Sequence, residues 1–178
     1  KDARLYNDVA FGGYLIWRGY PGRRVFIDGR NEVHAALLRE LAASVDDGRR
    51  WRELLDRHGV EGAVLRYRPE SVPVVDAVTG ARSVGTFSEL HFPRGDWALV
   101  YWDDVAMIFV ARRGRFADMA ESLEYREARP EAWAAGLMDA ARPEQTPLLV
   151  VEIRRRLGQD PGCRLALTAA ERYGIHSR

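Results

Sequence analysis

The sequence has little cysteine and almost no lysine, and both shortages restrict its chemistry. Of its 178 residues one is cysteine, Cys163, which excludes an intramolecular disulfide and a zinc site built on paired thiolates. Lys1 is the only lysine, and the remaining basic residues are arginines. No interior lysine is therefore present to form a Schiff base or to serve a Walker A loop.

The sequence also lacks a charge excess and a long apolar run. It contains 27 Lys and Arg residues and 26 Asp and Glu residues, which gives a formal net charge of +1. Non-specific binding to nucleic acid needs a clear basic excess, so no nucleic-acid partner is expected. No apolar run approaches the ~20 residues that span a bilayer. At 47% hydrophobic and 30% charged residues, the composition is typical of a globular chain of one domain, with or without a small appendage.

Recognisable catalytic motifs are missing too. The sequence contains no GxxxxGK[ST] phosphate loop, no GxGxxG dinucleotide fingerprint and no GxSxG nucleophile elbow. The four histidines are far apart and form neither an HxxxH nor an HExxH pair. The catalytic residues are therefore unknown from the sequence, and no cofactor is expected.

Hydrophobic patterning predicts an α/β (mixed α+β) domain over residues 1–114. Its apolar run at residues 11–17 fits either a short buried helix or a strand. The other expected elements are a buried strand over 25–27, helices over 32–45 and 50–58, and a strand over 62–67. Gly59 is expected to cap the second helix. The order of strand, helices and strand is that of a crossover unit and predicts two parallel strands.

Two β-rich runs predict a hairpin at the end of this domain. Residues 97–102 and 105–110 flank the polar pair Asp103-Asp104, which indicates a turn. With the earlier strands they complete a small mixed sheet of about four strands. Between 69 and 95 proline and glycine interrupt the pattern, and a short helix is expected at 83–90.

Helical spacing dominates the remainder, so residues 115–178 are expected to form a C-terminal helical tail. The expected helices cover residues 116–125, 131–141, 148–157 and 163–173. Asp160-Pro161 before an alanine-rich helix is similar to the junction between two tetratricopeptide repeats. At most one and a half units are visible, whereas about three make a self-supporting array. The alternative, which the spacing favours, is a helical bundle that packs on the sheet.

Asp28 and Arg30 are the polar residues best placed to bind a ligand. Asp28 follows the strand expected at 25–27, and ligands favour the carboxyl ends of strands in open α/β sheets. Arg30 can hold a phosphate or carboxylate. The alternative is structural: Asp28 caps the next helix and Arg30 neutralises it. Asp28, Glu32 and His34 are weak candidates for a divalent metal site, and no metal is expected there because such spacing is common by chance.

A longer pattern is more specific than these local signals. It consists of NDVAFGGYLIW (residues 7–17), VFIDGR (25–30), WRELLDRHGV (51–60) and WALVYWDDVA (97–106). Together these segments resemble the C-terminal soluble region of large bacterial multi-pass membrane proteins. Those proteins are similar to glycosyltransferases of the dolichyl-phosphate-mannose protein mannosyltransferase type, and some continue into tetratricopeptide repeats. The resemblance covers roughly residues 5–112.

The resemblance implies an extracytoplasmic domain, in the periplasm or on the outer face of the inner membrane. It also implies a tether to an upstream membrane region of the same chain, which is expected to carry the catalytic acid. The first hypothesis is thus a non-catalytic accessory domain that binds an acceptor or a lipid-linked sugar, with Tyr14, Trp17, Asp28 and Arg30 as the binding residues. The second is a protein–protein interaction module that binds its partner through the helical tail. The third is a metal-dependent enzyme acting on sugar phosphates or nucleotides.

Overall fold

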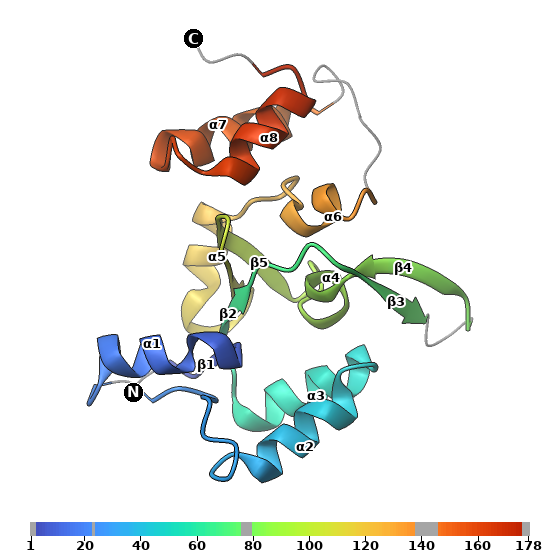
Figure 1. The fold of residues 1–178 in the computed structure, drawn as a ribbon. Helices are drawn as coiled ribbons and strands as arrows, with labels where there is room; N and C mark the ends of the chain where they lie inside the picture. The colour runs from blue at the N-terminus through green and yellow to red at the C-terminus, as the bar shows by residue number, and fades with distance from the viewer. Residues whose placement is uncertain (1–2, 23, 76–79, 138–145, 176–178) are drawn as a thin grey trace.

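The chain adopts the mixed α+β fold that the sequence predicts (Figure 1). The computed structural model describes residues 3–22, 24–75, 80–137 and 146–175. The strands are β1 (Leu5–Asn7), β2 (Gly62–Arg66), β3 (Ser71–Val75), β4 (Arg82–Thr86), β5 (Trp97–Trp102) and β6 (Ala106–Ala111). The helices are α1 (Val9–Gly19), α2 (Ala35–Ser44), α3 (Gly48–His58), α4 (Phe87–His91), α5 (Ala117–Leu123), α6 (Pro130–Ala134), α7 (Pro147–Gln159) and α8 (Arg164–Arg172). A 3-10 turn, η1, spans Gly114–Phe116.

The main sheet has four strands in the order β1-β2-β6-β5. The pair β1–β2 is parallel, and the other two pairs are antiparallel. One face of the sheet packs on α3 and α4 through aromatic contacts, such as Tyr6 against Trp51 with ring centroids 5.4 Å apart. On the opposite face α5 places Ala120 against Ala98 and Val110. The expected four-stranded mixed sheet is confirmed.

The first strand of the parallel pair is not the one the sequence predicts. Residues 25–27 form no strand, and β1 takes the edge position beside β2. The reason is that the side chain of Asn7 makes the backbone hydrogen bonds that a neighbouring strand would otherwise make. Asn7 accepts a hydrogen bond from the backbone N–H of Phe26 at 2.8 Å and donates one to the carbonyl of Ile27 at 2.7 Å. The segment is therefore buried at Ile27, and it is hydrogen-bonded to the end of β1 rather than paired along it.

The ambiguous run at residues 11–17 is helical and lies within α1. The carboxylate of Asp8 caps this helix by accepting a hydrogen bond from the N–H of Ala10 at 3.2 Å. The predicted helices at 32–45 and 50–58 are present as α2 and α3, and Gly59 ends α3 with a φ of 63°. Strand β2 matches the run predicted at 62–67.

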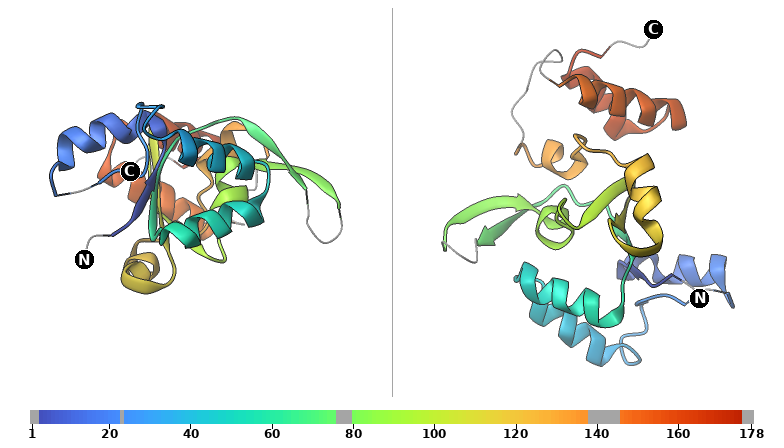
Figure 2. Two further views of the ribbon diagram at one scale, coloured as in Figure 1. Left: turned by 90° about the horizontal axis from the view of Figure 1, so that it is seen from below. Right: turned by 180° about the vertical axis from the view of Figure 1, so that it is seen from behind.

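The segment rich in proline and glycine forms a second, two-stranded sheet rather than a loop. Strands β3 and β4 pair antiparallel, from Ser71 opposite Thr86 to Val75 opposite Arg82. The helix predicted at 83–90 is thus wrong over its first half. Thr86 and Glu89 form a capping box that starts α4 at Phe87, so the preceding residues are free to pair as a strand. Figure 2 shows this hairpin projecting on the side of the molecule opposite to α1.

The predicted hairpin of β5 and β6 is confirmed, and each aspartate at its tip has a structural role. Asp103 accepts hydrogen bonds from the N–H groups of Val105 and Ala106 within the turn. Asp104 instead accepts from the N–H groups of Arg164 and Leu165, at the start of α8. The sheet therefore supplies the N-terminal cap of a helix about sixty residues further along the chain.

The helical tail is confirmed, and it packs against the sheet. The tail helices are α5 to α8. The helix expected at 131–141 is wrong over residues 135–137, because α6 ends at Ala134 and Gly136 has a φ of 68°; residues 138–141 lie outside the described residues. Trp102 of β5 contacts Trp133 of α6, with ring centroids 5.4 Å apart. One cluster of buried side chains extends from Tyr6 to Tyr173 and includes side chains of the tail helices. The domain boundary near residue 114 and the similarity to tetratricopeptide repeats remain predictions.

A buried histidine joins the α2–α3 pair to α4. His91 lies with Nδ1 2.8 Å from the carbonyl oxygen of Phe87 and Nε2 2.8 Å from that of Val45. Burial lowers the pKa of His91, and the charge of Arg68 acts in the same direction. The two carbonyl contacts and the charge of Asp46 oppose that shift. A neutral imidazole donates through one nitrogen only, so His91 can donate a hydrogen bond to both carbonyls only when it is protonated.

We expect the stability of the protein to fall on acidification because of His91. Its pKa in the folded chain lies below the usual value of about 6.5, so the unfolded chain binds the proton more readily. The stabilising contribution is complete above about pH 6.5 and is lost as the pH falls toward the lowered pKa. Denaturant unfolding at about pH 7.5 and pH 5 measures the difference. His91→Gln should lose this component and His58→Gln should keep it; equal pH dependence in both variants would contradict the assignment.

Candidate binding surface on α1

Helix α1 is fixed to the rest of the chain at its first turns. Asp8 caps the helix and is also ion-paired with Arg68, which follows β2. Gly12 is the buried residue of the helix, and it lies directly against the backbone of Ile27 and Asp28. A methyl group at Gly12 would come within 2.4 Å of the Ile27 carbonyl oxygen. The helix is therefore anchored by close backbone contact at one side.

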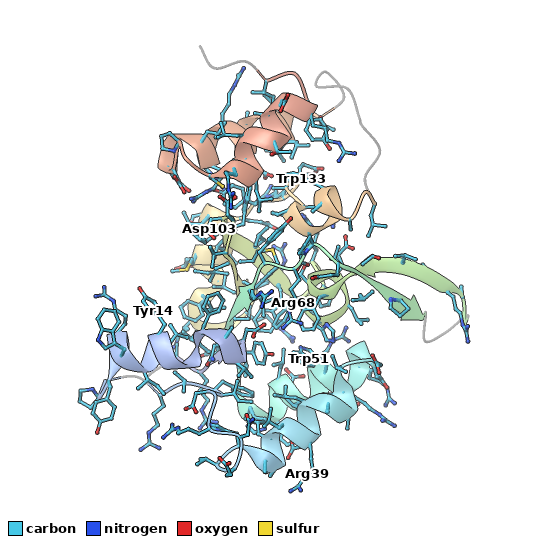
Figure 3. All side chains as sticks on the ribbon, in the orientation of Figure 1. Tyr14, Arg39, Trp51, Arg68, Asp103 and Trp133 are labelled. Atoms are coloured by element: carbon cyan, nitrogen blue, oxygen red, sulfur yellow. The ribbon has the colours of Figure 1, made fainter. Side chains whose placement is uncertain are left out.

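The other side of α1 exposes large aromatic side chains. Tyr14 is 58% exposed, Trp17 is 75% exposed, and Tyr20 immediately after the helix is 78% exposed. The rings of Tyr14 and Trp17 are 6.0 Å apart and tilted by 49°. Figure 3 shows Tyr14 pointing away from the body of α1 into open space. The four other tryptophans, all within the described residues, are buried, which makes Trp17 unusual.

Asp28 and Arg30 form a close ion pair with each other. Asp28 is only 3% exposed. The Arg30 guanidinium donates from Nε to Oδ1 at 2.9 Å and from Nη2 to Oδ2 at 2.6 Å, and the Arg30 backbone N–H donates to Oδ1 at 2.9 Å. These bonds from Arg30 hold the pKa of Asp28 well below its usual range, and a contact with His34 at 3.3 Å adds to the effect. Both carboxylate oxygens are thus engaged by Arg30, so the pairing half of the structural alternative holds. Its capping half is wrong, because the N-cap of α2 is His34 and no side chain caps that helix.

The structure separates the aromatic candidates from the ionic ones. At 100° per residue, Tyr14 and Trp17 lie on the side of α1 opposite Gly12, whereas Asp28 packs against Gly12 itself. A single ligand-binding cluster of all four candidates is therefore not formed. Asp28 and Arg30 instead stabilise the turn against which Gly12 of α1 packs.

The three weak metal candidates also divide. Asp28 and His34 meet, whereas the Glu32 side chain is exposed. Across the described ranges, no group of three or more His, Cys, Asp or Glu side chains is arranged to hold a metal ion. The hypothesis of a metal-dependent enzyme thus has no ligand set in that part of the chain.

A hollow beside the C-terminal end of α1 was not anticipated from the sequence. It has a volume of about 470 Å³, within the usual range of small-molecule sites. Its basic lining residues are Arg4, Arg24 and His58, and none of the described lining residues is acidic. Leu5 and Phe26 supply apolar surface. The available sequence signal was the absence of acidic residues from 9 to 27, a stretch that contains three arginines.

A second buried polar site is too small to hold a substrate. Glu131 accepts a hydrogen bond from the N–H of Ser88, while its other oxygen, Oε1, has no hydrogen-bond partner. Burial raises the pKa of this carboxyl. The adjoining cavity has a volume of about 30 Å³, which is on the scale of a water molecule rather than of a substrate. Glu131 therefore serves to cap α4.

Comparison with protein-family models, curated proteins and solved structures found no match to this chain. None of the helices in the described ranges is long and apolar enough to cross a membrane. The fold and the surface of α1 are accordingly the observations on which a function can be argued.

Proposed function

We propose that this chain is a non-catalytic, extracytoplasmic accessory domain of a membrane glycosyltransferase-like protein. In this proposal it binds an acceptor or a lipid-linked sugar at the surface formed by α1 and the adjoining hollow. The observation that carries the proposal is the exposed aromatic pair Tyr14–Trp17 on an anchored helix. The membrane tether and the location follow from the sequence resemblance.

The aromatic pair suits a sugar ring. Tyrosine and tryptophan present an apolar ring face together with a polar O–H or N–H group. A pyranose has the complementary character, because its C–H faces are apolar and its rim carries hydroxyl groups. Tyr14 and Trp17 lie on one side of the helix, one turn apart, and neither is covered by another element. Since α1 is fixed at Gly12, little ordering is needed when a ligand binds.

The hollow suits the phosphate of a lipid-linked sugar. Arg24 is exposed at its rim, and Arg4 lies at its wall, where it donates a hydrogen bond to the carbonyl of His58. Arginine binds phosphate oxygens through several N–H groups at once. Pro21 and Gly22 line the hollow and connect it directly to Tyr20. An anionic sugar carrier could thus contact the aromatic rings and the arginine-lined hollow together.

Exposed apolar side chains on the tail favour a second candidate function, the binding of a protein partner. Leu148, Val151 and Leu167 are exposed on α7 and α8. Deleting residues 115–178 would be a poor test, because Trp133 and Tyr173 belong to the buried cluster of the sheet. A polar substitution at Val151, which is 60% exposed, tests these side chains without disturbing the buried cluster.

We expect the chain to bind a short-chain prenyl-phosphate hexose, and Trp17→Ala to weaken binding about tenfold or more. Arg24→Ala should weaken binding of the prenyl-phosphate hexose but not of the free hexose, because only the former carries phosphate. Titration calorimetry on the folded chain measures both. Arg39→Ala, at an exposed arginine on α2 (Figure 3), is the matched control. Equal affinity in Trp17→Ala and wild type would contradict the proposed surface.

A further inference from the structure

The surface around α1 is aromatic and positively charged. Residues 9–27 contain Arg18, Arg23 and Arg24 but no aspartate or glutamate. Within the part of the chain that the structure describes, neither Arg18 nor Arg24 forms an ion pair. The Arg18 guanidinium lies 5.8 Å from the centre of the Trp17 ring. Among the described residues, two arginines are thus left without a carboxylate partner: Arg18 beside the Trp17 ring and Arg24 at the hollow.

The dimensions of α1 suit the surface of a bilayer rather than its interior. Eleven residues give a helix about 16 Å long, roughly half the thickness of the hydrocarbon core. Figures 1 and 2 show the helix projecting from the body of the molecule, so that its outer side is accessible to a flat surface. Tryptophan and tyrosine are enriched at the membrane interface, where the ring is in an apolar layer and its polar group reaches water or headgroups.

We propose that α1 docks parallel to the surface of an anionic lipid bilayer. Trp17 and Tyr20 enter the headgroup region, and Arg18 and Arg24 contact lipid phosphates. Electrostatic attraction between basic side chains and an anionic leaflet strengthens binding of this kind and weakens as salt is added. The complementary charge identifies the occupant of the surface: it is negative and extended, and it accepts hydrogen bonds from indole and phenol groups.

A second copy of the chain fits this surface less well. In a twofold dimer through α1, the same patch would face itself, bringing the unpaired Arg18 and Arg24 of each copy near those of the other. Each arginine would lose water without gaining a carboxylate. An anionic bilayer supplies the missing negative charge, and another copy does not.

This inference extends beyond the proposed function, because lipid docking requires neither a bound sugar nor an upstream transferase. The two proposals also fail separately. Calorimetry with the prenyl-phosphate hexose tests the sugar site without a bilayer, and sugar-free vesicles test the docking surface.

The test is co-sedimentation of the 178-residue chain with phosphatidylcholine vesicles prepared with and without phosphatidylglycerol. We expect binding to the anionic vesicles, weakened by salt, and little binding to the zwitterionic ones. Because the other tryptophans are buried, a blue shift of fluorescence on binding reports on Trp17. Trp17→Ala and the double variant Arg18→Ala, Arg24→Ala should each reduce the bound fraction several-fold.

Matched substitutions on helices other than α1 serve as controls. Val151→Ser removes an exposed apolar side chain on α7, and Arg39→Ala removes an exposed arginine on α2; both should bind like the wild type. The proposal is overturned if anionic vesicles do not retain the folded chain, or if these controls reduce binding as much as the α1 variants. It is also overturned if Trp17→Ala instead dissolves a dimer seen by sedimentation, since a second copy would then occupy the surface.

Discussion

Substitution of Gly12 by alanine is expected to destabilise the protein by about 2–3 kcal/mol, the cost of overpacking a close contact. The added methyl group would lie 2.4 Å from the carbonyl oxygen of Ile27 and 2.6 Å from Cα of Asp28. Both are backbone atoms, and the segment that contains them is held in place by Asn7 and by the Arg30 ion pair. The helix or the segment must therefore move, and neither can do so by turning a side chain.

The neighbouring glycine provides the control. Gly13 lies in the same helix, and a methyl group there would meet nothing within 4 Å. Alanine is the better helix former by about 1 kcal/mol, so Gly13→Ala should leave the free energy of unfolding unchanged or raise it. Denaturant unfolding of both variants measures the difference. If the two substitutions have the same effect, the close contact of α1 with residues 27 and 28 is not as described.

The elements that could be predicted are those whose signals are local. Gly59 was expected to end α3 because glycine tolerates the left-handed backbone of a helix cap, and its φ of 63° is that conformation. The β5–β6 hairpin follows from two β-rich runs beside Asp103. In both cases the deciding atoms lie within a few residues of one another.

The predictions were wrong or incomplete where the structure depends on a residue far away in the sequence. An apolar, β-branched run at 25–27 predicts a strand, but the side chain of Asn7 takes the hydrogen bonds that a strand would need. Strand β1 has three residues, too few for an alternating pattern to be recognised. Nothing near residue 104 in the sequence indicates that Asp104 caps α8.

The candidate site was predictable in part. The residues Asp28 and Arg30 are close in sequence, and their pairing follows from that proximity. The exposure of Trp17 could not be predicted. The chain has five tryptophans, and the hydrophobic pattern does not distinguish the exposed Trp17 from the buried Trp51. Burial depends on which faces of the elements pack together in the folded chain. Because α1 packs through Gly12, Trp17 lies on the outer side of the helix.

Removing the carboxylate of Glu152 should have the larger of the two expected effects on stability. Glu152 lies on α7, is 3% exposed, and accepts hydrogen bonds from the backbone N–H groups of three consecutive residues, Arg126, Glu127 and Ala128. These residues belong to no helix or strand, so their N–H groups do not donate hydrogen bonds to the backbone within such an element. Each buried N–H left unpaired costs about 1–3 kcal/mol, and we expect Glu152→Ala to lower the free energy of unfolding by about 3–5 kcal/mol.

The same loop shows why one carboxylate has so large an effect. Its carbonyl groups are held in a matching way, with Arg94 donating to the carbonyls of Arg126 and Ala128. Glu152 thus completes the set of bonds by which α7 is joined to the connection that leaves the sheet. Glu127→Ala is the control, because that carboxylate is exposed in the same loop. Thermal and denaturant unfolding should show a loss confined to Glu152→Ala; a similar loss in Glu127→Ala would instead implicate the charge of the loop rather than the bonds that Glu152 accepts.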